Sequence, residues 1–243
     1  MSVTEFVSAV WARATAVQPA PPALVVALLA LLALVVVGSP RGYRLVRHGV
    51  TVLHEAGHAG VALMVGRRLS GIRLHADTSG VTVSRGRTRG PGMVATVFAG
   101  YPAPALVGLV ATILLGQGYA VGVLWALVAV AAGMVVFVRN LYGFGVLVLL
   151  GLTVGVASWT MPAVVLSALA WLLVWTLLLA APRSVVELAA DRGRTSRRGY
   201  RDTTSDAAQL AGLTGVPAPV WVGLFGAVTT GSAVVGTWLM VAP

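Results

Sequence analysis

Two histidines and a glutamate stand close together in the chain, at a spacing that suits a metal site. His54, Glu55 and His58 form the pattern H-E-x-x-H. On a helix, histidines four residues apart project from one face, so both imidazoles can bind one Zn²⁺, and the glutamate beside them can take a proton from a water that the metal activates. The chain has no cysteine, so a metal must be held by nitrogen and oxygen ligands. The motif predicts a zinc site with Glu55 as the general base.

The stretch around this motif is otherwise apolar. Ionisable groups are costly inside a membrane and are usually functional there, and one metal ion would explain all three of these residues. The alternative is a pair of histidines hydrogen-bonded to neighbouring helices. That arrangement needs three independent polar partners at one depth in the bilayer, so we interpret the motif as a metal centre.

Composition indicates that the elements around the motif are membrane helices. Hydrophobic residues make up 58% of the 243 residues and charged residues 10%, whereas an ordinary globular domain is roughly half apolar and a quarter charged. Apolar blocks of roughly the 20 residues that a spanning helix needs lie at 23–38, 49–66, 92–116, 119–138, 141–157, 161–181 and 217–241. We predict an all-α membrane protein, a polytopic bundle of about six to seven spans. Residues 23–243 would form one integral-membrane domain, preceded at 1–22 by a tail or an interfacial helix.

The polar segment 67–91 carries a strand pattern. Apolar and polar residues alternate at 72–76 and again at 81–84, and turn-forming residues lie between them at 77–80. This pattern predicts a small β-hairpin at 71–85, after the second span. Such a hairpin would lie against the membrane surface or over a cavity between the helices.

The net charge of +10 comes entirely from arginine, because the chain has no lysine. The arginines gather at the ends of apolar blocks, which is typical of topology signals and not of a nucleic-acid-binding surface. With these spans, fourteen arginines, the N-terminus and the loops 67–91 and 182–205 lie on one side, and Arg41, Arg44 and Arg47 lie opposite. The positive-inside rule makes the first side cytoplasmic, as in a multi-pass protein of the bacterial inner membrane. The basic loop 182–205 is expected to bind anionic lipid headgroups.

Several segments resemble the site-2 protease family of intramembrane zinc metalloproteases. They are HEAGHAGVAL at 54–63, the hairpin at 71–85, FAGYPAPALVG at 98–108 and RNLYG at 139–143, which is similar to the asparagine-containing motif of the family. Ser205-Asp206-Ala207 is similar to a segment of the compact actinobacterial members, which have no PDZ or other soluble domain. The resemblance spans residues 42–230, is specific at 54–58 and is looser elsewhere. It implies a metalloprotease-like domain in which Asn140 holds an unwound substrate.

The chain departs from this family at the third zinc ligand. Site-2 proteases supply an aspartate in Leu-Asp-Gly after the motif asparagine, whereas Val148 stands in this place, eight residues after Asn140. The candidates that remain are Asp206, Asp191, Glu187, Asp202, His75 and Asp77. We favour Asp206, because the apolar stretch after it suits a short helix that dips into the bundle. In a span that crosses the membrane, His58 would lie about 13 Å below the cytoplasmic boundary, within reach of such a helix. The alternative is that Asp206 only caps this helix.

Gly100, Pro102 and Pro104 lie inside the predicted span at 92–116. Broken helices at membrane depth tend to line cavities, so Gly100 joins Asn140 as a candidate for substrate binding. The alternatives are a kink without function and, for Asn140, a cap on the helix that begins beside it.

These features favour a zinc-dependent intramembrane endopeptidase that acts on membrane-embedded or membrane-anchored proteins. Its substrate would be an unwound transmembrane segment that pairs with a strand edge of the hairpin. Two other classes stay open. One is a non-catalytic metal-binding scaffold, which the missing Leu-Asp-Gly supports. The other is a metal-ion transporter, although the spans at 92–138 and 161–181 are nearly free of the ionisable residues that an ion path needs.

Overall fold

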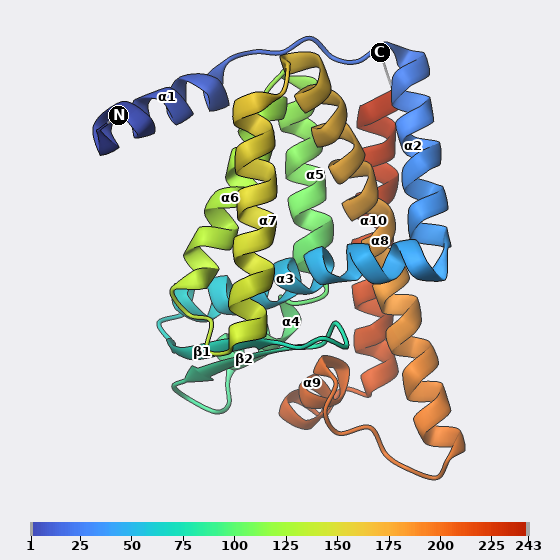
Figure 1. Cartoon of the computed structure of the whole chain (residues 1–243). Coiled ribbons are helices and arrows are strands. Elements are labelled where there is room, and N and C mark those ends of the chain that lie inside the picture. Colours follow the sequence, from blue (N-terminus) through green and yellow to red (C-terminus); the bar gives the residue numbers. More distant parts are fainter. Residues whose placement is uncertain (1, 242–243) are drawn as a thin grey trace.

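The computed structural model describes residues 2–241, which form a bundle of helices above one small sheet (Figure 1). The helices of this part are α1 Val3–Thr15, α2 Ala23–Gly38, α3 Pro40–Met64, α4 Pro91–Phe98, α5 Pro102–Gly116, α6 Ala120–Val135, α7 Leu141–Thr160, α8 Ala163–Arg197, α9 Asp206–Thr214 and α10 Ala218–Val241. The strands are β1 Arg68–Leu74 and β2 Gly80–Arg85. The predicted class, a helical bundle with a small hairpin, agrees with this arrangement.

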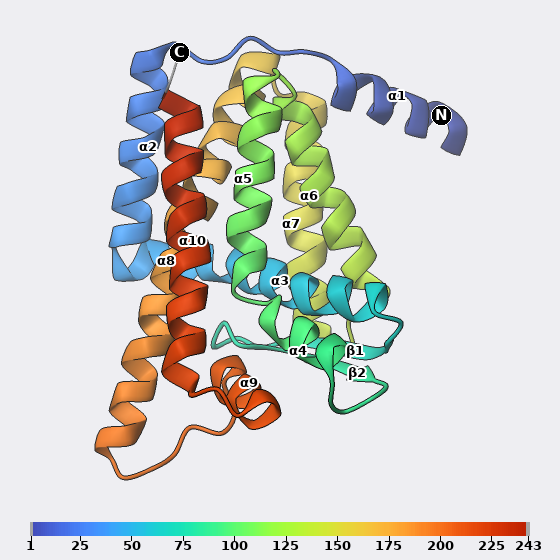
Figure 2. The same cartoon turned by 180° about the vertical axis from the view of Figure 1, so that it is seen from behind.

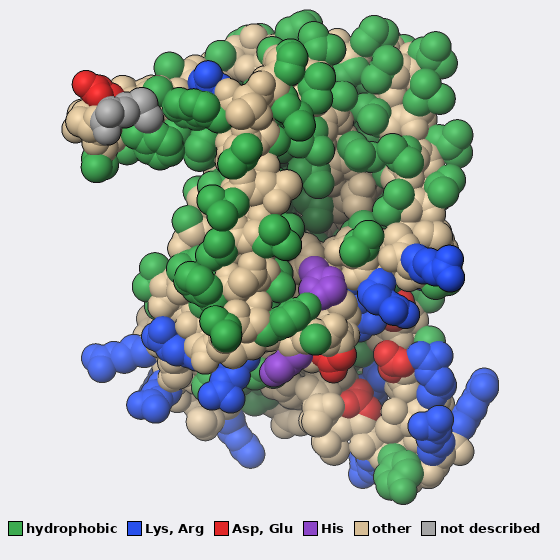
Figure 3. All heavy atoms as spheres, viewed as in Figure 1, with side chains coloured by type: hydrophobic (Ala, Val, Ile, Leu, Met, Phe, Trp, Pro, Cys, Tyr) green, Lys and Arg blue, Asp and Glu red, His purple; other side chains and the backbone are tan. Residues whose placement is uncertain are grey.

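The main core lies between α2, α5, α6, α8 and α10. Its fully buried side chains include Leu115, Leu124, Val174 and Leu178. Apolar side chains also cover much of the outer surface of the upper helices, as Figure 3 shows. A continuous apolar surface of this kind is typical of a protein surrounded by lipid.

Within residues 2–241, α7, α8 and α10 are each long and apolar enough to cross a membrane. The number rises to as many as five if each of two bent helix pairs, α2 with α3 and α4 with α5, forms one span. α6 is a shorter apolar helix. The predicted number of six to seven spans is therefore not confirmed.

Residues 49–66 do not form a separate crossing helix, contrary to the prediction. They belong to α3, which is bent by 97° from α2 and runs across the bundle between the upper helices and the hairpin (Figures 1 and 2). Ser39 begins the new helix by accepting a hydrogen bond from the Gly42 N–H group, with Pro40 in the first turn. Because α3 lies across the bundle, residue count along it does not measure depth, and the predicted 13 Å does not apply.

The second bend separates α4 from α5 and follows the residues that predicted a broken helix. The two helices meet at 68°, with a break between Phe98 and Pro102. α3 packs tightly against this break, because a Cβ atom at Gly57 would lie only 2.5 Å from the Ala103 Cβ and 2.8 Å from the Ala99 carbonyl oxygen. The glycine inside the H-E-x-x-H motif therefore permits the close packing that places α3.

The predicted hairpin is confirmed, with its first strand beginning earlier, at Arg68. β1 and β2 pair antiparallel, with Ile72 opposite Thr82 and Leu74 opposite Gly80. Ile72 and Leu74 are buried in a cluster that contains Val52 and Ala59 of α3. One face of the hairpin thus lies against the helix that carries the motif.

The arginines gather at one end of the molecule, over the hairpin, the start of α3 and the end of α8 (Figure 3). Only Arg13 of α1 lies at the other end, where it donates a hydrogen bond to the carbonyl of Ser158 near the end of α7. The predicted placement of the N-terminus beside the basic loops is therefore wrong. The reason is the bend after α2. Because α3 does not run from one end of the bundle to the other, Arg41, Arg44 and Arg47 lie at the same end as the loop 67–91, and the N-terminus, which precedes α2, lies at the opposite end.

The long helix α8 extends past α3 and leads through a loop into α9 (Figure 1). α8 passes α3 at Ala180, which shares a cluster with Val37, Tyr43 and Val50, and becomes charged from Arg183 onward. α9 is held under the bundle by buried Leu210. This return brings the start of α9 toward the motif helix.

Candidate metal centre

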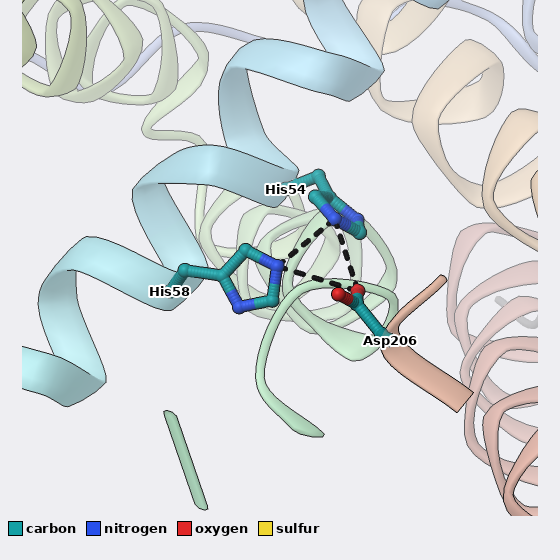
Figure 4. A group of neighbouring side chains, drawn as sticks. All are labelled: His54, His58 and Asp206. Carbon is teal, nitrogen blue, oxygen red and sulfur yellow. Dashed lines mark hydrogen bonds and ion pairs between the residues drawn. The ribbon is translucent and has the colours of Figure 1, made fainter. Parts of the chain in front are cut away.

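His54 and His58 lie on the same face of α3, as their spacing predicted, and their rings meet at the side of the helix that faces α9 (Figure 4). The two Nε2 atoms are 3.0 Å apart. The Nδ1 atom of His58 lies 2.7 Å from the carbonyl oxygen of Thr96 on α4. Because a carbonyl can only accept, this contact places a proton on Nδ1 and leaves the Nε2 lone pair free for a metal.

Asp206 approaches the same point from α9. Its Oδ2 atom lies 3.2 Å from His54 Nε2 and 3.3 Å from His58 Nε2. The cap of α9 is Ser205, whose hydroxyl accepts a hydrogen bond from the Ala208 N–H group, while Asp206 is the first helical residue. The alternative in which Asp206 caps its helix is therefore wrong, because the neighbouring serine fills that position.

The three ligand atoms fit one metal ion. They form a triangle with sides of 3.0, 3.2 and 3.3 Å, and ligand atoms that lie about 2.0–2.1 Å from a tetrahedral zinc ion are separated by about 3.3 Å. Apart from the two imidazoles, the buried Asp206 Oδ2 has no hydrogen-bond partner among the described residues. A buried carboxylate oxygen of this kind is costly unless a cation or a donor faces it. These three residues form the one group of histidines and acids suited to a metal that we find in residues 2–241.

Electrostatics favour the ionised form of Asp206. Burial alone would raise the pKa of this carboxyl group, but contacts with the His54 and His58 rings outweigh burial and hold the pKa well below its ordinary value. An ionised carboxylate between two imidazoles is the state that a cation requires.

Glu55 lies beside the triangle with its carboxylate directed toward the hairpin. The side chain is 3% exposed. Its Oε2 atom accepts a hydrogen bond of 2.5 Å from the Thr82 hydroxyl of β2. Oε1 lies against Gly80, where an added Cβ atom would be only 2.5 Å away.

A cavity of about 260 Å³ opens beside these residues, between α3, the tip of the hairpin, α8 and α9. His54, Glu55 and Asp206 all line it, together with Tyr101 and Gly80. The arrangement can hold a small polar group next to a metal and a carboxylate base at the same time.

The other predicted ligand candidates lie away from the triangle, each with its own partner. Glu187 pairs with Arg47, Asp191 with Arg194, Asp202 with Arg192, and both His75 and Asp77 bind Ser79 at the hairpin turn. Val148, at the position where the family motif has aspartate, lines an apolar cavity with Phe6 and Trp125. Among the candidates, only Asp206 is brought to the histidines.

Asn140 and Gly100, the predicted substrate-binding residues, both make contacts within the protein, and their role in substrate binding stays a prediction. The Asn140 side chain pairs with the backbone of Leu74, accepting from its N–H group at 3.2 Å and donating to its carbonyl at 2.6 Å. Gly100 lies against His54 and His58, because a Cβ atom there would be 2.4 Å from His58 Nε2. Neither residue is among those that line the cavity. Asn140 occupies the N-cap position of α7, as the alternative had it, but its side chain makes no capping hydrogen bond.

Sequence reasoning missed three residues that shape the site. Thr96 orients His58, and Thr82 binds Glu55. Tyr101 stacks edge-to-face on His54, with ring centroids 4.9 Å apart. No local pattern in the sequence marked these contacts, because each joins residues that are far apart in the chain.

Comparison with known proteins agrees with this geometry. The family model described as Peptidase M50B-like matches residues 25–236, a stretch that includes all the site residues above. No curated protein and no solved structure matches the chain. The predicted site-2 protease relationship is confirmed, and the chain belongs to the Peptidase M50B-like family.

Proposed function

We propose that this protein is a zinc-dependent endopeptidase that cleaves membrane-embedded or membrane-anchored proteins. The observation that carries the proposal is the convergence of His54, His58 and Asp206 on one point, with Glu55 beside them in a shared cavity. Two histidines and a carboxylate leave a coordination position open, which is typical of catalytic and not of structural zinc sites.

The residues of the chain divide the work of peptide hydrolysis among them. Zinc at this point would activate a water and polarise the scissile carbonyl. Glu55 would take the proton of the attacking water and pass it to the leaving amine. Thr96 keeps the His58 ring in the orientation and tautomer that ligation needs.

The hairpin offers the substrate one strand edge. The outer edge of β1 is already occupied, since the Ile72 N–H group donates to Phe137, the Ile72 carbonyl accepts from Arg139, and Leu74 is bound by Asn140. In an antiparallel pair, two residues that lie opposite each other turn their backbone N–H and C=O groups either both toward each other or both away. Ile72 and Leu74 turn theirs away from β2, so Thr82 and Gly80, which lie opposite them, turn theirs away from β1. The free edge of β2 therefore presents Gly80 and Thr82 beside Glu55, and an extended substrate segment would pair there.

The position of α3 suits cleavage close to the membrane boundary. The motif helix crosses α8 just before α8 becomes charged, at the arginine-rich end of the bundle. A transmembrane substrate would need to unwind only near its end to reach the cavity. By the positive-inside rule this end faces the cytoplasm, and its arginines would contact anionic headgroups.

The experiment combines zinc analysis with proteomics. Glu55→Gln should keep its zinc, because Glu55 is not a ligand, and should lose at least about 10²–10⁴-fold in cleavage rate. Membrane proteomes of wild-type and Glu55→Gln cells would reveal the substrate as a protein that stays intact only in the variant. His58→Ala should lose zinc, whereas His48→Ala, a histidine of the same helix bound to Tyr142, should keep it.

The competing functions give different results. Intact cleavage of every protein in Glu55→Gln cells would favour a metal-binding scaffold. Zinc uptake into vesicles that requires His54 and His58 but not Glu55 would favour a transporter.

A further inference from the structure

The carboxylate of Glu55, the proposed general base, contacts the hairpin as well as belonging to α3. The Thr82 hydroxyl donates to Glu55 Oε2 at 2.5 Å and lies 3.3 Å from the Glu55 backbone carbonyl. Within residues 2–241, this is the one hydrogen bond that we find on the Glu55 carboxylate. Glu55 is almost fully buried, so loss of this hydroxyl would leave Oε2 without a hydrogen-bond donor from the protein.

Gly80 provides the space that this carboxylate occupies beside the hairpin. Gly80 and Thr82 are alternate residues of β2, so they face the same side of the hairpin. The absence of a side chain at Gly80 leaves room for Glu55 Oε1, which would otherwise meet a Cβ atom at 2.5 Å. Thr82 binds one oxygen of the carboxylate, and the other is left to accept a proton.

We propose that Thr82 is the positioning residue of the general base, and that it couples substrate pairing on β2 to the orientation of Glu55. The inference rests on the proposed function. The backbone N–H and C=O groups of Gly80 and Thr82 point toward the free edge of β2, where the substrate would pair. The face of the strand that carries the Thr82 side chain and the bare Cα atom of Gly80 lies against Glu55. The Thr82 hydroxyl binds Glu55 in this structure, and a substrate strand that pairs with β2 would restrain the backbone that carries this hydroxyl and so keep the carboxylate in this orientation.

The test compares three substitutions in the full-length protein. Thr82→Val keeps the shape and the strand preference but removes the hydroxyl, and Thr82→Ser keeps the hydroxyl. Val83→Thr is the matched control, because Val83 is 49% exposed and faces the opposite side of the strand. Zinc content and cleavage of the membrane-anchored protein identified with Glu55→Gln are measured for each.

We expect Thr82→Val to lower kcat by roughly 10- to 100-fold, as misplacement of a catalytic group does, with zinc content and KM near wild type. Thr82→Ser should recover most of kcat, and Val83→Thr should match wild type. The proposal is overturned if Thr82→Val has normal kcat, if Thr82→Ser is as slow as Thr82→Val, or if Thr82→Val loses its zinc. Cleavage that survives Glu55→Gln would instead overturn the proposed function itself, so the two failures are distinguishable.

Discussion

At the scale of single residues, the candidate centre depends on atoms that belong to separate parts of the chain. α3 supplies both imidazoles, α9 supplies the carboxylate, and α4 supplies the carbonyl that orients His58. A metal ion would offset the cost of burying Asp206 beside two rings with few other partners. The ligand role of Asp206 stays a prediction, and it can be tested directly.

Asp206→Ala should lower zinc affinity and cleavage together. Loss of a residue that only hydrogen-bonds a metal ligand typically lowers metal affinity by about 10- to 100-fold. Loss of a ligand itself should lower zinc affinity by at least this much. Competition with a zinc-binding dye would measure the affinity. Gln209→Ala on the exposed side of α9 is the control and should bind zinc normally. A normal zinc affinity in Asp206→Ala would remove Asp206 from the ligand set.

Gly100→Ala should also reduce zinc binding, for a steric reason. The new Cβ atom would lie 2.4 Å from His58 Nε2 and 2.6 Å from His54 Cε1, so both rings must move. Gly60→Ala is the matched change, because a Cβ atom at Gly60 of α3 meets nothing within 4 Å. Zinc content of the two purified proteins decides the matter, and equal zinc in both would contradict the tight packing at Gly100.

At the scale of elements, a network at the end of α8 holds the beginning of α9. Arg192 donates to the Asp202 carboxylate and to the Ser205 hydroxyl. Burial raises the pKa of Asp202, but hydrogen bonds from the Ser205 hydroxyl and from the backbone of Thr204 and Ser205 outweigh it and lower the pKa below its ordinary value. The ionised Asp202 thus ties the loop to the residue immediately before Asp206.

Arg192→Ala should therefore weaken zinc binding, though less than Asp206→Ala does. Loss of Arg192 frees the loop and the α9 cap without removing a ligand, so we expect about 10-fold lower affinity. Arg194→Ala is the control, since Arg194 pairs with Asp191 on the surface and exposed ion pairs contribute little. Equal zinc affinity in both variants would show that this network does not place Asp206.

At the scale of the whole molecule, the bend between α2 and α3 decides the distribution of charge. It brings Arg41, Arg44 and Arg47 of α3 to the end that carries the arginines of the hairpin and of the end of α8, where the candidate metal centre lies, whereas Arg13 lies at the other end. The spans predicted from the sequence had placed three arginines opposite the other fourteen, whereas the structure places only Arg13 opposite the rest. The distribution of arginines in the structure therefore agrees better with the positive-inside rule. It implies that the two ends of the bundle face opposite sides of the membrane.

Single cysteines can test this topology, because the natural chain has none. Ser196→Cys, near the end of α8, should resist an impermeant thiol reagent in intact cells, and Gln117→Cys, between α5 and α6, should react with it. Both positions are exposed. Permeabilised cells, in which both should react, provide the control. Reaction at Ser196→Cys in intact cells would reverse the orientation.

The sequence by itself determined the local features of this protein. Helical spacing placed His54 and His58 on one face, alternation at 72–84 predicted the hairpin, and Gly100 with Pro102 predicted the broken helix. These predictions succeeded because each depends on the period or the conformational limits of neighbouring residues.

Only the tertiary structure decided how these features meet. The 97° turn into α3 overturned the predicted span at 49–66 and the side of the N-terminus. Apolar composition identifies a helix that can be buried but carries no information about its direction in the bundle. In the same way, the sequence left six candidates for the third ligand, and Asp206 reaches the histidines because buried Leu210 of α9 packs with Val97 of α4 and Phe225 of α10. Such contacts join residues far apart in the chain, and their energies depend on the complementary shapes of whole elements, which no local pattern encodes.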